Sequence, residues 1–312
     1  MNSPRNNISL QINLSASDLP ICRQLLERQI VFWYDEVDEI LLSVESQKSR
    51  GKFAVGFDAN QAALSDYIKA LTNRYPKLRY HYIDYSPERG RALSDMFFGG
   101  ATVPHKDYRG GPFYCYFDGL ASCRNRYIMH LDSDMILGGI PNTWLQDAVT
   151  LLSSDPAYIF INPLAGPPTA NFAIKQDFYQ RLGNYRFVFR KMSTRVFLTD
   201  RDRLAAHPLR LRKVKKTLRN WKWFFRSKMR WGYELPEILI TEMMQRDGLL
   251  RVDTYGQTES DACFTLHPVL KPKAFIESLP ELLRRIDCND IPESQRGYYN
   301  VHNDFFDFES VQ

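Results

Sequence analysis

The sequence predicts an α/β protein with a mixed, mostly parallel sheet flanked by helices. Short apolar runs, alternating or continuous, are separated by segments whose apolar residues recur at helical spacing. The order strand, helix, strand, helix, strand implies parallel strands joined by crossover helices. A length of 312 residues with 44% hydrophobic and 25% charged residues excludes a disordered or fibrous chain. We expect a single compact body with two halves.

The elements of the first half follow in order. Apolar and polar residues alternate over 8–14, which predicts a half-buried strand. Asp18 and Pro20 then predict the capped start of a helix. The further predicted elements are a buried strand over 39–44, a helix through 64–75, a strand over 78–83, a long loop over 88–111 with a short helix at 91–98, a helix through 113–120 and a buried strand over 127–131.

The second half begins after two more predicted elements. Thr143 and Gln146 resemble a capping box for a helix over 143–152, and 157–161 reads as a strand. The segment 162–170 contains three prolines, which argues against regular structure there. We therefore place the change from a first half, over 1–161, to a second half, over 162–274, in this segment, and expect a tail over 275–312 that packs on the body. The tail carries Tyr298, Tyr299, Phe305, Phe306 and Phe308.

Composition limits where the protein acts. No stretch approaches the roughly 18 apolar residues of a spanning helix, and Met1–Asn7 lacks the apolar core of a secretory signal. The five cysteines are scattered without a CxxC pair, which argues against a disulfide framework or a structural zinc site. Both observations predict a cytoplasmic protein with free thiols.

The positive charge is concentrated in one segment. The formal net charge is +5, but Leu209 to Arg230 contains ten Lys or Arg and no acid, so the rest of the chain sums to −5. Such a chain lacks the broad basic face of a nucleic-acid-binding protein, and we expect no nucleic-acid partner. The segment interleaves aromatic and aliphatic residues with its cations, which suggests an amphipathic helix. It is either an interfacial helix on an anionic membrane, at the inner face, or a solvated helix with its aromatics in the core.

An acidic tripeptide follows the buried strand over 127–131. Asp132 and Asp134 flank Ser133, and in an extended chain residues i and i+2 project to the same face. Paired carboxylates attract a divalent cation, and ligands of open α/β sheets lie at the carboxyl ends of strands. Two solvated aspartates in a loop are the alternative, since this motif is common.

The ordered set of motifs resembles the GT-A-fold, Rossmann-like nucleotide-sugar glycosyltransferases, particularly the family 2 type. The matching parts are an acid after the second strand at Glu45, YIMHLDSDMIL over 127–137, PEILITEMMQRDG over 236–248, and CFTLHP over 263–268. The resemblance covers roughly residues 8–267, and it implies that the half over 1–161 binds the nucleotide sugar and the half over 162–274 binds the acceptor. It departs from the family where the usual Glu-Asp pair reads Pro236-Glu237.

The resemblance implies roles for these residues. Asp134 would bind Mn²⁺ or Mg²⁺, Asp132 would contact the ribose or share the metal, and His267 would be a further ligand that favours Mn²⁺. The cation would stabilise the diphosphate leaving group. Glu237, in the first turn of a helix, would take the proton of the acceptor hydroxyl and give inversion by single displacement. Glu234 is the reserve candidate for this base.

The remaining predicted contacts are with the nucleotide and the acceptor. Glu45 would accept a hydrogen bond from the base, uracil by default. Lys106 and Arg109, in a loop with two glycines, would meet the diphosphate. Trp231 and Tyr233 would stack on a sugar of the acceptor, although core aromatics are equally consistent with the sequence. Asn13, Leu14 and Ser15 would line the pocket of the base.

The sequence therefore predicts a metal-dependent hexosyltransferase that uses a nucleotide-diphosphate sugar, with a UDP-sugar favoured. The acceptor is a glycan, a lipid-linked sugar or a small molecule. A sugar-nucleotidyltransferase is the first alternative, but the glycine-rich signature usual after its first strand is missing from Ile12 to Pro20. A non-catalytic protein that binds nucleotide sugars or anionic membranes is the second.

Overall fold

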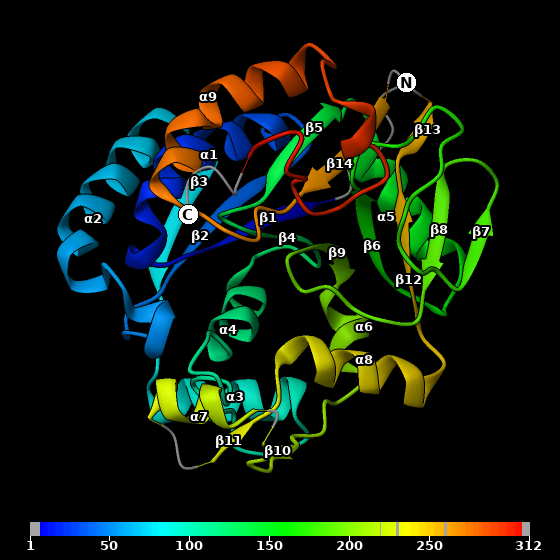
Figure 1. Cartoon of the computed structure of the whole chain (residues 1–312). Coiled ribbons are helices and arrows are strands. Elements are labelled where there is room, and N and C mark those ends of the chain that lie inside the picture. The colour runs from blue at the N-terminus through cyan, green and yellow to red at the C-terminus, as the bar shows by residue number, and fades with distance from the viewer. Residues whose placement is uncertain (1–6, 219, 229–230, 259–260, 308–312) are drawn as a thin grey trace.

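A computed structural model describes residues 7–218, 220–228, 231–258 and 261–307. Within this part of the chain, twelve strands form the central sheet (Figure 1), with the order β3-β2-β1-β4-β9-β6-β12-β8-β7 along its main path. The strands are β1 (Ile8–Leu14), β2 (Glu39–Val44), β3 (Leu78–Tyr82), β4 (Tyr127–Asp132), β6 (Tyr158–Ala165), β7 (Gln180–Leu182), β8 (Arg186–Phe189), β9 (Val196–Asp200) and β12 (Leu250–Thr254).

The sheet is mixed, as predicted, and its β3-β2-β1-β4 part is entirely parallel. β1 pairs in parallel with β2 and β4, β2 with β3, and β6 with β12. β9 runs antiparallel between β4 and β6, and β8 runs antiparallel to both β12 and β7 at one edge. β14 (Asp261–Leu266) joins the sheet beside β6 and pairs antiparallel with β5 (Ile136–Ile140) and β13 (Gly256–Thr258). β10 (Lys213–Val214) and β11 (Gly232–Tyr233) form a separate ribbon.

Helices cover both faces of the sheet. On one face the cluster of buried side chains unites the sheet with α1 (Leu19–Trp33), α2 (Phe57–Arg74) and α5 (Trp144–Ser154). On the other it unites the sheet with α3 (Pro87–Phe97), α4 (Tyr114–Ser122), α6 (Arg201–Ala205) and α8 (Pro236–Asp247). α9 (Lys273–Asp287) packs on α1 and β5, and the short α7 (Trp221–Ser227) lies on the side of the molecule away from α9 (Figure 1).

Three short 3-10 helices, η1 (Ala16–Asp18), η2 (Gly51–Ala54) and η3 (Glu293–Gln295), complete the elements. Phe275 and Phe305 of the C-terminal region are buried against β5 and β14, and an isolated bridge joins His267 to Asn300. Phe308 lies outside the described residues. Within the described part, no helix combines the length and apolarity needed to cross a bilayer. The cysteines are free, as predicted.

The first strand is buried on both faces, not on one as predicted. Its alternating polar residues face α4, where Gln11 is fully buried and donates from Nε2 to Asn13 Oδ1 at 2.9 Å. Gly119 allows this approach, because a Cβ at that position would lie 2.5 Å from Gln11 Nε2. Polar alternation therefore marks a strand whose second face meets a closely packed helix.

Several local predictions are wrong. α3 begins at Pro87 and fills more of the predicted loop, because Ser86 caps it by accepting from the backbone of Arg89. β6 continues through Pro163 to Ala165. The described pairing of β6 with β9 ends at Ile161, so Pro163, which has no N–H to donate, interrupts no bond to β9.

Asp18 and Thr143 stand at the predicted N-cap positions of α1 and α5, but without the predicted side-chain caps. The side chain of Thr143 caps nothing but instead donates to Asp261 at 2.7 Å. Asp18 likewise makes no side-chain cap bond at the start of α1.

The basic segment is not one amphipathic helix. Its described residues form an extended stretch with β10, a turn in which Thr217 accepts from the backbone of Trp221, and then α7 of only seven residues. Pairing of β10 with β11 holds the first part extended and prevents helix formation there. Arg219, Met229 and Arg230 lie outside the described residues.

Candidate active site

The acidic tripeptide lies at the carboxyl end of β4, in a turn and not in the extended form predicted. The turn is closed by a hydrogen bond from Met135 N–H to the Asp132 carbonyl at 3.1 Å. Asp132 accepts from the hydroxyl of Tyr116 on α4 at 3.2 Å, and Asp134 forms an ion pair with Lys271. The two carboxylates nevertheless share an environment, since both raise the pKa values of Asp18 and Arg195.

Arg195 is the cation at the centre of this environment. It directly precedes β9, and its carbonyl accepts from Asp132 N–H at 2.7 Å. Burial alone would lower the pKa of the Arg195 guanidinium, but Tyr299, Asp134 and Asp132 together raise it. Arg195 is therefore a fixed positive charge between the acidic tripeptide and the C-terminal region.

Asp134 is held in its ionised form by these cations. Burial raises the pKa of the Asp134 carboxyl, yet Lys271, Arg195 and His267 outweigh burial and lower it. Its Oδ1 atom is buried and has no hydrogen-bond partner among the described residues. His267 stacks on Tyr299 with ring centroids 5.9 Å apart, and burial, followed by Arg195, lowers the pKa of the imidazole to about 4. Asp134 and His267 are thus close enough to influence each other.

The three predicted ligands do not form a ready metal site. In the described ranges, no group of three or more His, Cys, Asp or Glu side chains is placed to hold a metal ion. The Lys271 ammonium pairs with Asp134, and His267 Nδ1 lies 3.2 Å from Asn300 Oδ1. This arrangement therefore supports no catalytic step through a metal.

Glu237 faces the same region from the first turn of α8. Burial raises the pKa of its carboxyl, against the lowering effects of Arg195 and Arg109. Its side chain makes no hydrogen bond or ion pair with the other residues that the structure describes. By contrast, the reserve candidate Glu234 is paired with Arg212 at 3.2 Å. Glu237 is therefore a carboxylate whose proton affinity is raised and whose oxygens are available.

The loop over 106–111 carries two cations, of which Arg109 acts on the site around Glu237 and Lys106 pairs with Glu45. Lys106 donates to Glu45 at 2.6 Å, whereas Arg109 reaches the environment of Glu237. Lys52, on η2, is a further cation: burial and then the charges of Arg109, Lys271 and Arg195, among others, lower the pKa of its ammonium. Arg109, Arg195 and Lys271 therefore all lie near enough to act on Lys52, and together these cations favour an anion. Two of them already pair with an acid, Arg109 with Asp107 at 3.5 Å and Lys271 with Asp134.

The predicted nucleotide-binding residues lie at the neighbouring strand ends. Asn13 is in register with Asp132, and its Nδ2 is buried without a partner among the described residues. Leu14 is buried, and Ser15 caps η1 by accepting from Ser17 N–H. The carboxylate of Glu45 is surrounded by donors, which come from Tyr85, Lys106 and the backbone of Gln47.

Two cavities flank these strand ends. The smaller, of about 230 Å³, is lined by Ala16, Val44, Glu45, Ser46, Gln61, Leu64, Ser65 and Tyr82. The larger, of about 430 Å³, lies at the carboxyl ends of β6 and β12, and its lining includes Asn162, Lys175, Lys191, Ser193, Arg251 and Tyr299. The larger cavity lies next to Arg195 and His267, because Tyr299, which lines it, is acted on by Arg195 and stacks on His267.

Trp231 and Tyr233 are brought to the loop over 106–111, not to the larger cavity. Tyr108 N–H donates to the Tyr233 carbonyl at 2.8 Å, and the rings of Trp231 and Tyr233 meet edge to face at 5.6 Å. Trp231 is 56% exposed and carries Lys213 over its ring. Their contact with an acceptor stays a prediction.

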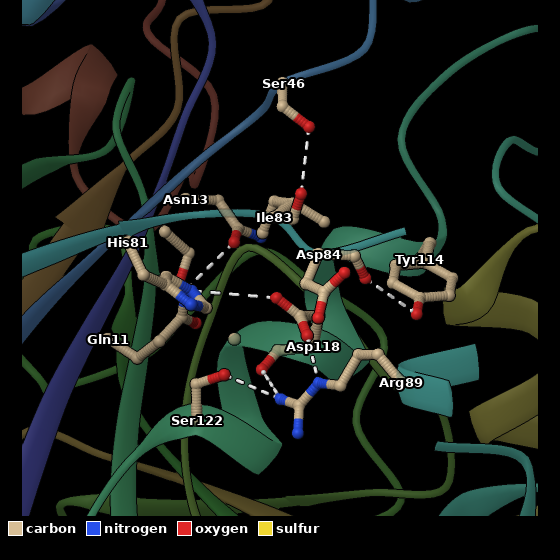
Figure 2. Close-up of polar contacts among 12 residues, drawn as sticks. Gln11, Asn13, Ser46, His81, Ile83, Asp84, Arg89, Tyr114, Asp118 and Ser122 are labelled. Carbon is tan, nitrogen blue, oxygen red and sulfur yellow. Dashed lines mark hydrogen bonds and ion pairs between the residues drawn. The ribbon is translucent and has the colours of Figure 1, made fainter. Parts of the chain in front are cut away.

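A buried polar network supports the strand ends from the α4 side. Figure 2 shows His81 pointing toward Asp118, which is paired with Arg89. Burial, followed by Arg79 and Arg89, lowers the pKa of His81 to about 4, so this ring is neutral at pH 7. Closer to the site, His130 lies between Gln11 and Asp132, with Nε2 3.5 Å from Asp132 Oδ1.

Sequence reasoning missed three of the four converging cations. The three missed cations are Arg195, Lys271 and Lys52, which lie outside the motifs. Arg195 is also distant in the sequence from β4, whose last residue, Asp132, it contacts. A cation directly before a buried strand was the only local signal for Arg195.

Comparisons with known proteins give distant structural similarities. No protein-family model matches the sequence, and a search of curated proteins gave no match. Among solved structures, the 4-diphosphocytidyl-2C-methyl-D-erythritol synthase of Anaerococcus prevotii is 11% identical over 90% of this chain and 100% of its own, with a TM-score of 0.43. A UDP-glucose pyrophosphorylase complexed with UDP-glucose is 9% identical over 90% and 99%, with a TM-score of 0.43.

A mannosyltransferase from Pyrobaculum calidifontis, solved in complex with GDP-Man and Mn²⁺, is also similar. It is 12% identical over 64% of this chain, with a TM-score of 0.35, and the match spans 45% of that enzyme.

Asp18 should make the stability of the protein depend on pH. Burial, opposed by Lys271, raises its pKa from 3.8 to about 6, so the folded state loses stability as the pH rises through this range and does not regain it above. Asp18→Asn removes the titration and should stabilise the protein at about pH 7.5 by up to about 3 kcal/mol, with little effect at about pH 4. Chemical denaturation across this range measures the difference.

Asp66→Asn is the matched control, because Asp66 is an exposed residue of α2. Its stability profile should follow that of the wild type. If the Asp18→Asn profile also runs parallel to the wild type, Asp18 does not control the pH dependence.

Lys271 should compete with divalent cations for Asp134. Because Mn²⁺ would have to displace the ammonium group, Lys271→Ala should raise Mn²⁺ affinity at least about tenfold, or about 1.4 kcal/mol. Titration calorimetry without nucleotide measures this. Lys273→Ala, at an exposed residue paired only with Glu277 in the described structure, should leave the affinity unchanged. Equal affinities in all three proteins would remove Asp134 as a metal ligand.

Proposed function

We propose that this protein is a glycosyltransferase of the GT-A type that moves a sugar from a nucleotide-diphosphate sugar, with UDP favoured, to an acceptor hydroxyl. The observation that carries the proposal is the convergence of one available carboxylate, Glu237, with four cations at the carboxyl end of β4. A diphosphate satisfies the cations, and a reacting hydroxyl satisfies the carboxylate. Family 2 membership is part of the same proposal and rests on the order of the sequence motifs.

The donor would lie along the ends of β1, β2 and β4. The nucleobase enters the smaller cavity, whose walls combine Leu64 and Val44 with the polar side chains of Gln61 and Ser65. The carboxylate of Glu45 already accepts four hydrogen bonds. Glu45 would therefore hold Tyr85 and Lys106 in place at the pocket and would not itself bind the base.

The diphosphate would be neutralised by Arg109, Arg195, Lys52 and Lys271. When the bond to the sugar breaks, negative charge grows on the diphosphate, and positioned cations stabilise that charge in the transition state. Binding of the diphosphate would also draw Lys271 from Asp134 and leave this carboxylate able to accept a cation. Mn²⁺ or Mg²⁺ at Asp132, Asp134 and His267 remains a separate part of the proposal, tested by the Lys271 variant.

Glu237 would accept the proton of the attacking hydroxyl. Its raised pKa improves its strength as a base, while the nearby Arg195 and Arg109 keep it ionised. Attack from the face opposite the leaving diphosphate inverts the anomeric centre. Residue Asp132 would then contact the ribose, as Tyr116 holds one of its oxygens in place.

The acceptor would occupy the larger cavity, beside Arg195 and Tyr299. Its lining offers amide and hydroxyl groups of Asn162 and Ser193 together with the ammonium groups of Lys175 and Lys191. Arg251 and Asp253 neutralise each other through two hydrogen bonds of 2.7 and 3.1 Å. A polar, hydroxylated acceptor suits this lining. Trp231 and Tyr233 would contact the part of the acceptor or sugar that extends toward the loop over 106–111.

Glu237→Gln should lower turnover by about 10²- to 10⁴-fold, because the amide cannot accept the proton. Donor affinity should stay unchanged. A panel of UDP-, GDP- and dTDP-sugars, scored for release of the nucleoside diphosphate with water or added acceptors, provides the activity. Calorimetry with UDP provides the affinity.

Glu242→Gln on the same helix is the matched control, since Glu242 is paired with Arg212 at 2.9 Å and is not in the site. Full turnover in Glu237→Gln would reassign the base, with Glu234 as the next candidate. Formation of a nucleotide sugar and pyrophosphate from UTP and a sugar 1-phosphate, without transfer, would identify a nucleotidyltransferase.

Arg195→Met should weaken UDP binding at least about tenfold, the loss of a charge-assisted hydrogen bond of about 1.5–3 kcal/mol. Arg195→Lys keeps the charge and should give an intermediate affinity. Arg190→Met is the control, because Arg190 lies over the ring of Tyr179 at 3.6 Å, away from the cations of the site. If all variants bind UDP like the wild type, the diphosphate does not lie at Arg195.

A further inference from the structure

One surface of the protein combines exposed apolar side chains with unpaired cations. Leu218 is 94% exposed, Phe225 is 76% exposed and Trp221 is 44% exposed. Trp221 and Phe225 are one helical turn apart on α7, and their rings are 6.5 Å apart. Trp221 and Phe225 therefore share one outer face of α7, and Leu218 is exposed three residues before the helix begins; we call these three residues the α7 apolar patch.

Cations flank the patch along the chain. Lys215, Lys216, Lys222, Arg226 and Lys228 form no ion pair with any acid in the part of the chain that the structure describes. The whole segment from Leu209 to Arg230 contains no Asp or Glu. This density of positive charge is not needed for folding, since like charges in one segment repel each other.

The opposite side of α7 fixes the patch in place. Phe224 is buried, with its ring 5.6 Å from that of Tyr108. Trp223 lies between two cations, with Lys52 at 5.5 Å and Arg109 at 5.7 Å from its ring. The aromatic residues of α7 are therefore divided: two anchor the helix to the protein, and two project outward with Leu218.

We propose that the α7 apolar patch and its cations dock the protein on an anionic lipid bilayer. The charge of the segment complements anionic headgroups, and the apolar side chains are of the kinds that enter the interface between headgroups and acyl chains. A bilayer accounts for both features, whereas a nucleic acid would account for the cations but not for an aliphatic Leu218 at almost full exposure. This inference does not depend on the proposed catalytic function.

Flotation of the full-length protein with vesicles tests the proposal. Vesicles of phosphatidylcholine containing phosphatidylglycerol should carry the protein to the top of the gradient, whereas vesicles of phosphatidylcholine alone should not. Two variants separate the contributions: Trp221→Ser/Phe225→Ser removes the apolar part, and Lys215→Glu/Lys216→Glu reverses part of the charge. Each should reduce the fraction bound to anionic vesicles at least about tenfold, and raised salt should weaken the wild type.

The controls are an exposed apolar residue of α1, Val31→Ser, and the reversal of two exposed lysines elsewhere, Lys69→Glu/Lys273→Glu. Both should float like the wild type. Thermal unfolding and far-ultraviolet circular dichroism of the patch variants show that they are folded. The proposal fails if the wild type stays at the bottom with anionic vesicles, if control and patch variants bind equally, or if the protein binds a single-stranded RNA of mixed sequence but no vesicle.

Discussion

The insertion of one antiparallel strand determines the arrangement of the candidate site. β9 lies between β4 and β6, in register with β4 through Leu131 and Val196. Arg195 directly precedes this strand and is thereby fixed beside Asp132, with its own carbonyl bonded to the Asp132 amide. A buried carboxylate without a cation would lose its charge, since desolvation disfavours the ionised form. Lys271 and then Arg195 lower the pKa of the Asp134 carboxyl, so the ionised state of Asp134 depends in part on a strand that comes from the second half of the chain.

Opposite charges also limit what this site can bind. Lys271 neutralises Asp134 in the described structure, so the pair is balanced without a ligand. A bound diphosphate would give Lys271 and Arg195 a second partner, so that Asp134 could accept a cation. A metal that binds alone would have to break the ion pair between Lys271 and Asp134. Anion and metal binding are therefore expected to favour each other, because each removes the charge that opposes the other.

Local sequence signals predicted the strands and the tripeptide but not the partners of the site. The runs over 39–44 and 127–131 are apolar enough to identify buried strands. Two aspartates directly after a strand indicate a candidate functional site at the carboxyl end of that strand. Arg195 and Lys271 meet those aspartates only through strand pairings and loops that close over many residues, which local periodicity does not encode. The prediction of one helix in the basic segment was wrong for the same reason. Its composition is that of an amphipathic helix, but the pairing of β10 with β11 overrides this local preference.

The position of α7 gives the two proposals a physical connection. Trp223 and Phe224 contact residues of the loop that carries Arg109, and Lys52 lies both over Trp223 and within the field of Arg195 and Lys271. The outer and inner faces of this seven-residue helix are thus occupied by different partners, an exposed patch on one side and the cations of the candidate diphosphate site on the other. A helix this short has little stability of its own. Contacts that order its outer face must also hold Trp223 in place, and with it the cations that a diphosphate would meet.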